Sequence, residues 1–280
     1  MDHKLHIFNY GSAAGQLKNG VQFGSKSIID ELGKQYSLEI IEPFKEKSPR
    51  DVNVHNYDEI NNDCYLLHKQ ILENPRDKPI FLGGDHSMAI GTVSAMLEKY
   101  DDLFVIWIDA HADINTSETT LSNNIHGMPV AQLTDLEPKY KFDWIKKHLH
   151  FDNLLYIGIR DVDCGEIEFI KQHNIKTITV DDIKINGIEK ITKMIKEIIV
   201  DKPLHISLDV DGIDPKYIPS TGTSVNDGLE LDDIAYLISK MGNNLKSLDI
   251  VELNPMIGTS DDIKKSIDNT VYLIEQYIKN

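Results

Sequence analysis

The stretch "LFVIWIDAHADIN", residues 103–115, begins as an unbroken apolar run and then carries an acid or a histidine at every second position. Continuous hydrophobicity over a short run is typical of a strand that is buried on both faces in a parallel sheet. Asp109, His111 and Asp113 follow that run directly. Because carboxylates and imidazoles are common metal ligands, the stretch predicts a binding site at the end of a buried strand.

Similar short apolar runs recur along the chain and predict eight strands. They cover residues 4–10, 37–44, 78–84, 103–109, 154–160, 176–180, 204–210 and 247–254. Segments with helical spacing of apolar residues lie between several of them, at 87–100, 165–174, 187–200 and 231–242. This alternation indicates an α/β protein with a mostly parallel sheet covered by helices on both faces. No repeat or linker interrupts the series, so we expect one domain over residues 1–280.

The composition excludes several classes of protein. The formal net charge of -16 argues against binding to nucleic acid or to an anionic membrane surface, and it is compatible with a cationic small molecule. The two cysteines, Cys64 and Cys164, lack the spacing of a disulfide framework or a zinc site. The N-terminus has no signal-peptide pattern, and no apolar run reaches the ~18 residues of a membrane span. We therefore expect a soluble, cytoplasmic protein.

Ionisable residues follow four of the predicted strands. They are Asp85 and His86, the three residues named above, Asp209 and Asp211, and Glu252. The carboxyl ends of parallel strands share one edge of a sheet, and an extended backbone directs every second side chain to the same side, so we expect these groups to converge. Buried carboxylates repel one another unless cations neutralise them. Four aspartates and two histidines form an oxygen-rich set that suits Mn²⁺, and a pair of metal ions that activates water would favour hydrolysis.

The segment "GVQFGSKS", residues 20–27, raises the alternative of a phosphate-binding loop. Only three residues separate its glycines, and Ser25 stands before Lys26, so the motif does not fit. The start of a helix explains this segment better.

Four motifs, in order, resemble the ureohydrolase family, and most closely its arginases. They are "GGDHS" (83–87), "DAHADIN" (109–115), "SLDVDGIDP" (207–215) and "ELNP" (252–255). The resemblance implies a three-layer α/β/α fold with an eight-stranded parallel sheet and two Mn²⁺ ions. It also implies hydrolysis of the guanidinium group of L-arginine to L-ornithine and urea by a metal-bridging hydroxide, in a homo-oligomer that is a trimer or a hexamer. The metal ligands it implies are His86, Asp109, His111, Asp113, Asp209 and Asp211.

The same resemblance assigns further roles. Asn115, Thr120 and Ser122 would bind the α-carboxylate of the substrate, Asp163 and Glu166 would face its α-amino group, and Thr223 would lie near the substrate. Glu252 would hold the guanidinium, Asp113 would take the proton of the hydroxide, and His126 would exchange protons between the leaving amine and solvent.

Departures from the arginase pattern leave alternatives open. Asn123 and Asp227 stand where the pattern has glycine, which could shift the loop that binds the carboxylate, and the chain ends soon after its last helix. The rival functions are another ureohydrolase, either an agmatinase or a formiminoglutamase, and a catalytically silent relative that binds arginine. A site with donors for a carboxylate favours arginine over agmatine, which has none.

Overall fold

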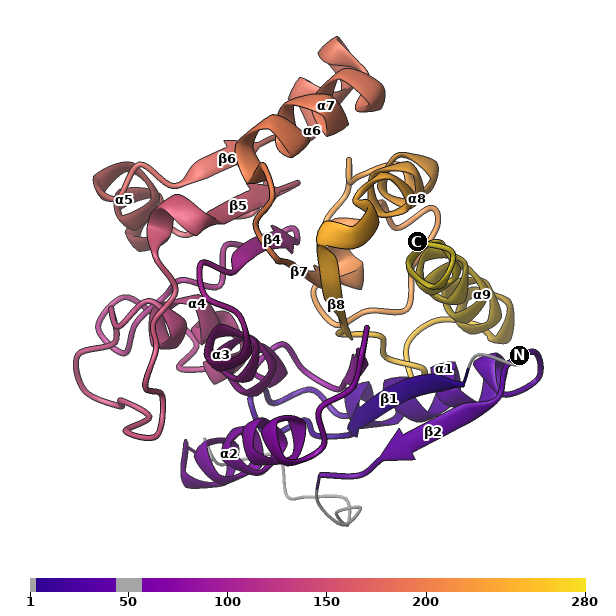
Figure 1. The fold of residues 1–280 in the computed structure, drawn as a ribbon, viewed down its shortest axis with the longest axis horizontal. Helices are drawn as coiled ribbons and strands as arrows, with labels where there is room; N and C mark the ends of the chain where they lie inside the picture. Colours follow the sequence, from indigo (N-terminus) through magenta and orange to yellow (C-terminus); the bar gives the residue numbers. More distant parts are fainter. Residues whose placement is uncertain (1–3, 44–56) are drawn as a thin grey trace.

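The computed structural model describes residues 4–43 and 57–280 and contains an eight-stranded sheet in which all neighbouring strands are parallel (Figure 1). The strand order is β2-β1-β3-β8-β7-β4-β5-β6. The strands are β1 (Leu5–Tyr10), β2 (Leu38–Ile41), β3 (Ile80–Gly83), β4 (Phe104–Ile108), β5 (Leu154–Ile157), β6 (Lys176–Ile178), β7 (Leu204–Asp209) and β8 (Leu245–Val251). All eight predicted strands are confirmed.

Helices cover both faces of this sheet, which confirms the predicted three-layer α/β/α fold. One layer contains α1 (Gly24–Leu32), α6 (Val180–Asn186), α7 (Ile188–Ile199), α8 (Leu231–Lys240) and α9 (Ser260–Ile278). The other contains α2 (Tyr57–Glu73), α3 (Met88–Lys99), α4 (Pro129–Leu133) and α5 (Cys164–Gln172). The four predicted helices correspond to α3, α5, α7 and α8, and "GVQFGSKS" leads into α1 as expected.

The quoted stretch forms β4, in the interior of the sheet, and all five of its side chains are buried. Ile106 and Ile108 belong to the core beneath one helical layer, whereas Val105 and Trp107 belong to the core beneath the other. This two-sided burial explains why the run is continuously apolar. The edge strand β2, by contrast, has no fully buried residue.

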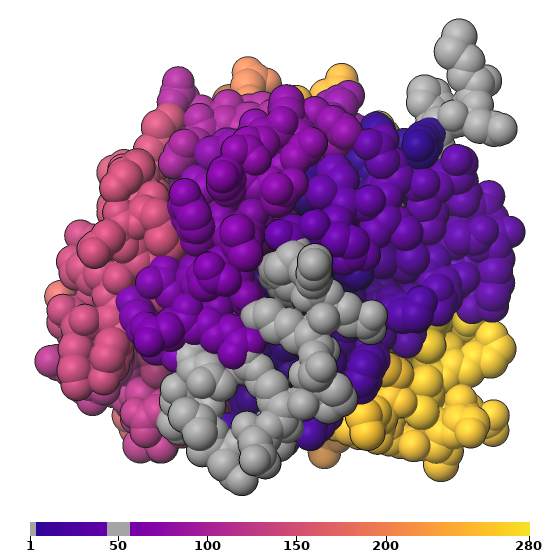
Figure 2. Space-filling view, turned by 90° about the horizontal axis from the view of Figure 1, so that it is seen from below, coloured from indigo at the N-terminus to yellow at the C-terminus, as the bar shows by residue number. Residues whose placement is uncertain are grey.

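Segments from near the beginning and the end of the described chain lie side by side. Figure 2 shows the face formed by the N-terminal segments, coloured indigo to purple, with the yellow C-terminal helix beside them. Helices α1 and α9 pack against each other there. Within the described part of the chain, no helix combines the length and hydrophobicity that a membrane crossing needs. Cys64 and Cys164 are both free thiols.

The strand order decides where the candidate site lies. Strands β3, β8, β7 and β4 are consecutive neighbours in the sheet, and these are the four strands that the ionisable motifs follow. Since all strands are parallel, their carboxyl ends bring these motifs to one edge of the sheet, as expected.

Candidate metal centre

The motifs converge, but their backbone is not extended as we predicted. Strand β4 ends at Ile108, the chain bends over the next three residues, and Asp113 has a φ of 51°. After β7 a 3-10 turn, η4 (Val210–Gly212), follows, and the carboxylate of Asp209 accepts a 2.8 Å hydrogen bond from the backbone N–H of Asp211. The prediction that an extended backbone brings every second side chain to the same side is therefore wrong. Tight turns after the strands direct these side chains to the centre instead.

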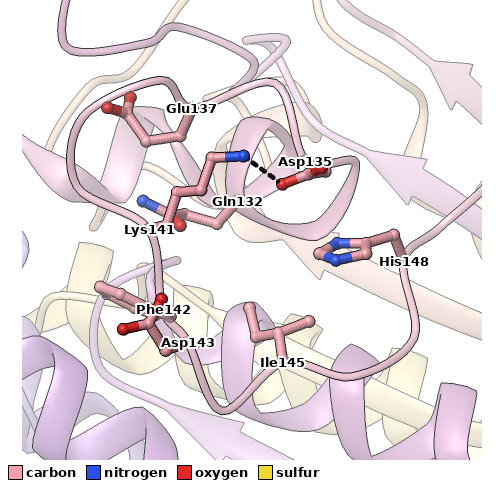
Figure 3. A pocket seen from close by; sticks show the side chains of 8 residues that line it. All are labelled: Gln132, Asp135, Glu137, Lys141, Phe142, Asp143, Ile145 and His148. Atoms are coloured by element: carbon pink, nitrogen blue, oxygen red, sulfur yellow. Dashed lines mark hydrogen bonds and ion pairs between the residues drawn. The ribbon is translucent and has the colours of Figure 1, made fainter.

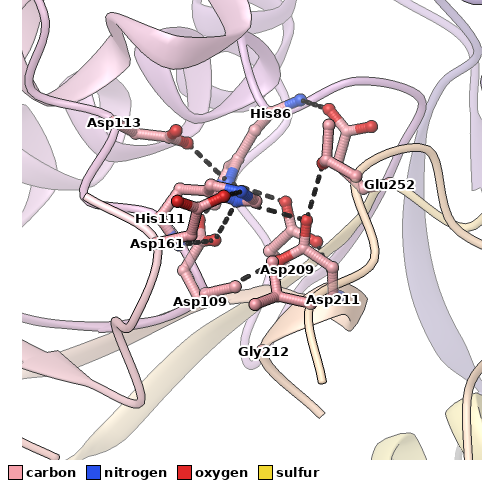
Figure 4. A network of polar contacts seen from close by, with 12 residues as sticks. His86, Asp109, His111, Asp113, Asp161, Asp209, Asp211, Gly212 and Glu252 are labelled. Atoms are coloured by element: carbon pink, nitrogen blue, oxygen red, sulfur yellow. Dashed lines mark hydrogen bonds and ion pairs between the residues drawn. The ribbon is translucent and has the colours of Figure 1, made fainter. Parts of the chain in front are cut away.

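One half of the centre surrounds His86, which is fully buried (Figure 4). Its Nδ1 lies 3.1 Å from Asp109 Oδ2, 3.0 Å from Asp113 Oδ2 and 3.4 Å from Asp209 Oδ2. This nitrogen has no hydrogen-bond partner of acceptable geometry. A ring nitrogen that faces three carboxylate oxygens in a dry site requires a positive charge between them.

The other half surrounds His111, whose side chain is 23% exposed. Its Nδ1 lies 3.4 Å from Asp109 Oδ1 and 3.3 Å from Asp211 Oδ2. On its far side, Nε2 lies 3.8 Å from a carboxylate oxygen of Asp161, which is 71% exposed. Among the described residues, two groups of side chains could each hold a metal ion, and both groups include Asp109.

The electrostatics of the centre favour the uptake of positive charge. Burial raises the pKa of Asp113 to about 6, and the charge of Asp109 adds to the effect. Burial and the charge of Asp211 raise the pKa of Asp209 well above its usual value. Burial opposes the charged form of His86, yet the neighbouring carboxylates outweigh it and raise the pKa of His86 well above its usual value. The donor set thus fits a divalent cation, which would replace these protons.

Trp107 contacts one histidine and one aspartate of the candidate ligand set, a role that was not predicted. Its ring stacks on that of His86, with centroids 4.1 Å apart and planes 13° from parallel. Its Nε1 donates a 3.0 Å hydrogen bond to Asp109 Oδ2. In the sequence Trp107 looks like one more apolar strand residue, so no pattern could have revealed this contact.

Glu252 lies beside the centre and is almost fully buried, with a φ of 66°. Its Oε1 accepts a 2.9 Å hydrogen bond from the backbone N–H of His86 and lies 3.0 Å from Nδ1 of His126. Its Oε2 accepts a 2.7 Å hydrogen bond from Gln16, a residue that sequence reasoning missed. Burial lowers the pKa of His126, but Glu252 outweighs it and raises that pKa to about 9.

Asp85, for which no role was predicted, holds the N-terminal loop against the centre. Its Oδ2 accepts a 2.7 Å hydrogen bond from the backbone N–H of Gly15, and the carbonyl of Gly15 accepts one of 3.2 Å from the backbone of His126. Gln16 follows Gly15 directly, so Asp85 places the residue that contacts Glu252.

The residues expected to bind the amino-acid end of a substrate come from two loops that meet. Nδ2 of Asn115 donates a 3.0 Å hydrogen bond to Asp163 Oδ2. Glu166 is buried, and its two oxygens accept hydrogen bonds from the backbone N–H groups of Ile114 and Asp163, at 3.1 and 3.0 Å. In this structure Glu166 thus holds the two loops together.

Of the remaining predicted residues, Thr120 is half-buried, Ser122 is exposed, and only Thr223 contacts the centre. The hydroxyls of Thr120 and Ser122 accept hydrogen bonds from the backbone N–H groups of Asn123 and Asn124, at 3.0 and 3.2 Å. Thr223 donates a 2.9 Å hydrogen bond to Oδ2 of Asp211 and so contacts a candidate metal ligand.

The two departures from the arginase pattern keep the backbone that glycine would adopt. Asn123 has a φ of 58° and Asp227 a φ of 59°, both in the left-handed region. Asparagine and aspartate tolerate this region better than other residues with a side chain. The loops therefore make the same kind of turn without glycine.

A separate hollow lies away from the centre (Figure 3), and no predicted site residue lines it. Glu137, at its edge, accepts hydrogen bonds from the backbone and the hydroxyl of Ser117, at 2.7 and 2.6 Å. An ion pair between Lys141 and Asp135 closes part of it. This region anchors the loop that carries Thr120 and Ser122.

Comparisons with known proteins agree with this geometry. The sequence matches the profile of the Arginase family over residues 4–277. It is 38% identical over 280 residues to a protein named arginase from Staphylococcus aureus (strain COL), with 92% of each chain covered, and 35% identical over 288 residues to arginase-2, mitochondrial, from Rattus norvegicus, with 94% of this chain and 81% of the relative covered. The crystal structure of Entamoeba histolytica arginase in complex with L-ornithine superposes with a TM-score of 0.87 at 32% identity, covering 96% of this chain and 97% of that chain.

Proposed function

The chain belongs to the arginase family, and we propose that it hydrolyses L-arginine to L-ornithine and urea at a centre of two Mn²⁺ ions. The observation that carries the metal assignment is the buried Nδ1 of His86, which has no hydrogen-bond partner and faces three carboxylate oxygens within 3.4 Å. The second cluster, around His111, shares Asp109 with the first, and this supports two ions side by side.

Six side chains would hold the two ions, and their oxygen-rich composition suits manganese. They are His86, Asp109, His111, Asp113, Asp209 and Asp211. When bound, the ions supply Lewis acidity and lower the pKa of a water molecule toward neutrality.

The protein's own groups bind and orient the substrate. A guanidinium stays protonated at physiological pH, and Glu252 provides the carboxylate that neutralises it. Gln16 and the backbone N–H of His86 fix the two oxygens of that carboxylate in place. At the other end, Asn115, Thr120 and Ser122 would receive the α-carboxylate, and Asp163, held against Glu166, would receive the α-amino group, with Thr223 nearby.

Proton transfer falls to two residues. Asp113, whose carboxylate lies in the buried half of the site beside His86, accepts the proton of the attacking water and passes it to the departing amine. His126, 18% exposed and next to Glu252, then exchanges protons with solvent. Asp113 is one of the candidate ligands, and His126 contacts Glu252 beside them.

A combined metal and product assay tests this proposal. Protein that is stripped of metal with a chelator and reloaded with Mn²⁺ is expected to bind two ions and to release urea and ornithine from arginine, with far less urea from agmatine. Chelated protein should be inactive until Mn²⁺ is restored. Arginine binding without urea release would favour the silent relative, and faster turnover of agmatine or formiminoglutamate would favour the other ureohydrolases. The homo-oligomeric state and the cytoplasmic location stay predictions.

A further inference from the structure

A row of polar side chains lies beneath the candidate metal centre, inside the sheet. Strand β7 contributes His205 and Ser207, β8 contributes Ser247 and Asp249, and the parallel register pairs His205 with Ser247 and Ser207 with Asp249. All four residues are completely buried. Polar groups in strands that are buried on both faces cost free energy unless they form hydrogen bonds. The partners of these four side chains therefore need to be identified.

Asp249 collects the hydrogen bonds of the row on one oxygen. Its Oδ2 accepts from the hydroxyls of Thr92, at 2.8 Å, and Ser207, at 3.0 Å, and Nε2 of His205 also lies 3.0 Å from it. A carboxylate oxygen accepts hydrogen bonds, so both hydroxyls donate to it, whereas Nε2 of His205 makes no hydrogen bond of acceptable geometry. The single hydroxyl hydrogen of Ser207 is therefore directed at Asp249.

This direction decides which nitrogen of His86 carries its hydrogen. Nε2 of His86 lies 2.9 Å from Oγ of Ser207. Because Ser207 has given its hydrogen to Asp249, its oxygen can only accept from His86, so Nε2 carries the hydrogen and Nδ1 keeps its lone pair. That same Nδ1 faces the carboxylates of the candidate centre.

We infer that Asp249, acting through Ser207, is a positioning residue that holds His86 in the Nε2–H tautomer and leaves Nδ1 free to bind a metal ion. The inference rests on the proposed metal centre. Trp107 restrains the plane of the same ring by stacking on it. The ring plane is thus restrained and the hydrogen of Nε2 is held by Ser207, so a metal ion can displace only the proton on Nδ1, and such outer-shell contacts typically strengthen metal binding ~10–100-fold.

A matched pair of hydroxyl deletions tests the inference. Ser207→Ala removes the acceptor of His86, and Ser247→Ala removes an equally buried hydroxyl that contacts His205 at the far end of the row. In calorimetric titration of metal-free protein with Mn²⁺, Ser207→Ala is expected to weaken one of two binding steps ~10–100-fold. Ser247→Ala should change neither step by more than ~3-fold.

A second variant tests the direction of the hydrogen bonds. The amide of Asp249→Asn can donate to Ser207, which can then turn its hydrogen toward His86 and favour the wrong tautomer. In ¹⁵N-histidine NMR spectra of protein loaded with diamagnetic Zn²⁺, the Nε2–H signal of His86 should be present in the natural protein and lost in this variant, while circular dichroism reports an intact fold.

The outcomes separate this inference from the proposed function. If Ser207→Ala binds both ions as tightly as the natural protein does, while that protein releases urea, the inference is overturned and the function stands. If the natural protein releases no urea but the two alanine variants differ in Mn²⁺ affinity as expected, the function is overturned and the positioning role stands.

Discussion

The two histidines of the candidate centre direct the same ring nitrogen at carboxylates but lie in opposite surroundings. His86 has no solvent contact, and its second nitrogen bonds to the buried Ser207. His111 is 23% exposed, and its second nitrogen lies 3.8 Å from the exposed Asp161. We call these the buried half and the open half of the centre.

The distances between Nδ1 and the carboxylate oxygens are similar in the two halves, but the interaction energies differ because the surroundings differ. In the buried half charges interact through a medium of low dielectric constant, and water cannot replace a lost partner. In the open half solvent reaches the ring of His111 but not its buried partners Asp109 and Asp211, so it screens these interactions only in part. The buried half therefore fixes geometry, whereas the open half admits solvent and ligand, and substitutions should have unequal effects in the two halves.

The largest expected effect is on turnover, from Glu252→Gln beside the buried half. This change removes the carboxylate that neutralises the guanidinium while keeping its shape. Loss of one partner from a buried charge pair costs about 3–5 kcal/mol, which corresponds to ~10²–10⁴-fold in kcat/KM for arginine. Metal analysis of the same sample should give the natural Mn²⁺ content. Normal turnover in this variant would remove Glu252 from the proposed mechanism.

The direct test of the comparison is a pair of ligand substitutions, His86→Asn and His111→Asn, in metal-free protein. The first leaves three carboxylates facing one another without solvent and should lower the free energy of unfolding by about 3 kcal/mol. The second removes a ring that is 23% exposed from two buried carboxylates and should cost less than the first, because water can enter the space that the ring leaves. Urea denaturation at pH 7.5 measures both. Equal losses would mean that burial does not separate the two halves.

The sequence predicted the fold well because burial and chain direction leave local patterns. The continuous run in β4 and the ionisable residues after four strands follow from a sheet covered on both faces. The turns were predicted less well. Asp113 and Glu252 reach the centre through left-handed backbone, a conformation that hydrogen bonds formed elsewhere in the fold must support.

The residues behind the ligands were missed for two physical reasons. Trp107 and Gln16 act through contacts that exist only once distant segments pack together. Ser207 and Asp249, however, carry a signal in the sequence, since a polar side chain in a strand buried on both faces must find a partner. Their positions two and three residues before Asp209 and Glu252 could have linked them to the site.

A smaller effect is expected at His126, which is 18% exposed and so lies between the two extremes. Its pKa is raised from 6.5 to about 9, mainly because Glu252 outweighs burial. A raised pKa stabilises the fold fully below pH ~6.5 and loses this contribution as the pH rises through 9. The natural protein should therefore exceed His126→Asn in stability at pH 6.5, by at most about 3 kcal/mol, and this margin should shrink by pH 9.5. Urea denaturation of both metal-free proteins measures it, and a constant margin would contradict the assigned pairing.

The smallest effect is expected from Asp161→Asn in the open half. Asp161 is the counterpart of Ser207, because each lies at the second nitrogen of a histidine ligand. A 3.8 Å contact to a carboxylate that is 71% exposed is worth about 0–1 kcal/mol, so Mn²⁺ affinity should fall by less than ~5-fold. Raising the salt concentration should erase the difference, since solvent ions screen exposed charges. A loss as large as that expected for Ser207→Ala would mean that Asp161 orients His111 as firmly as Ser207 orients His86, and the distinction between the two halves would fail.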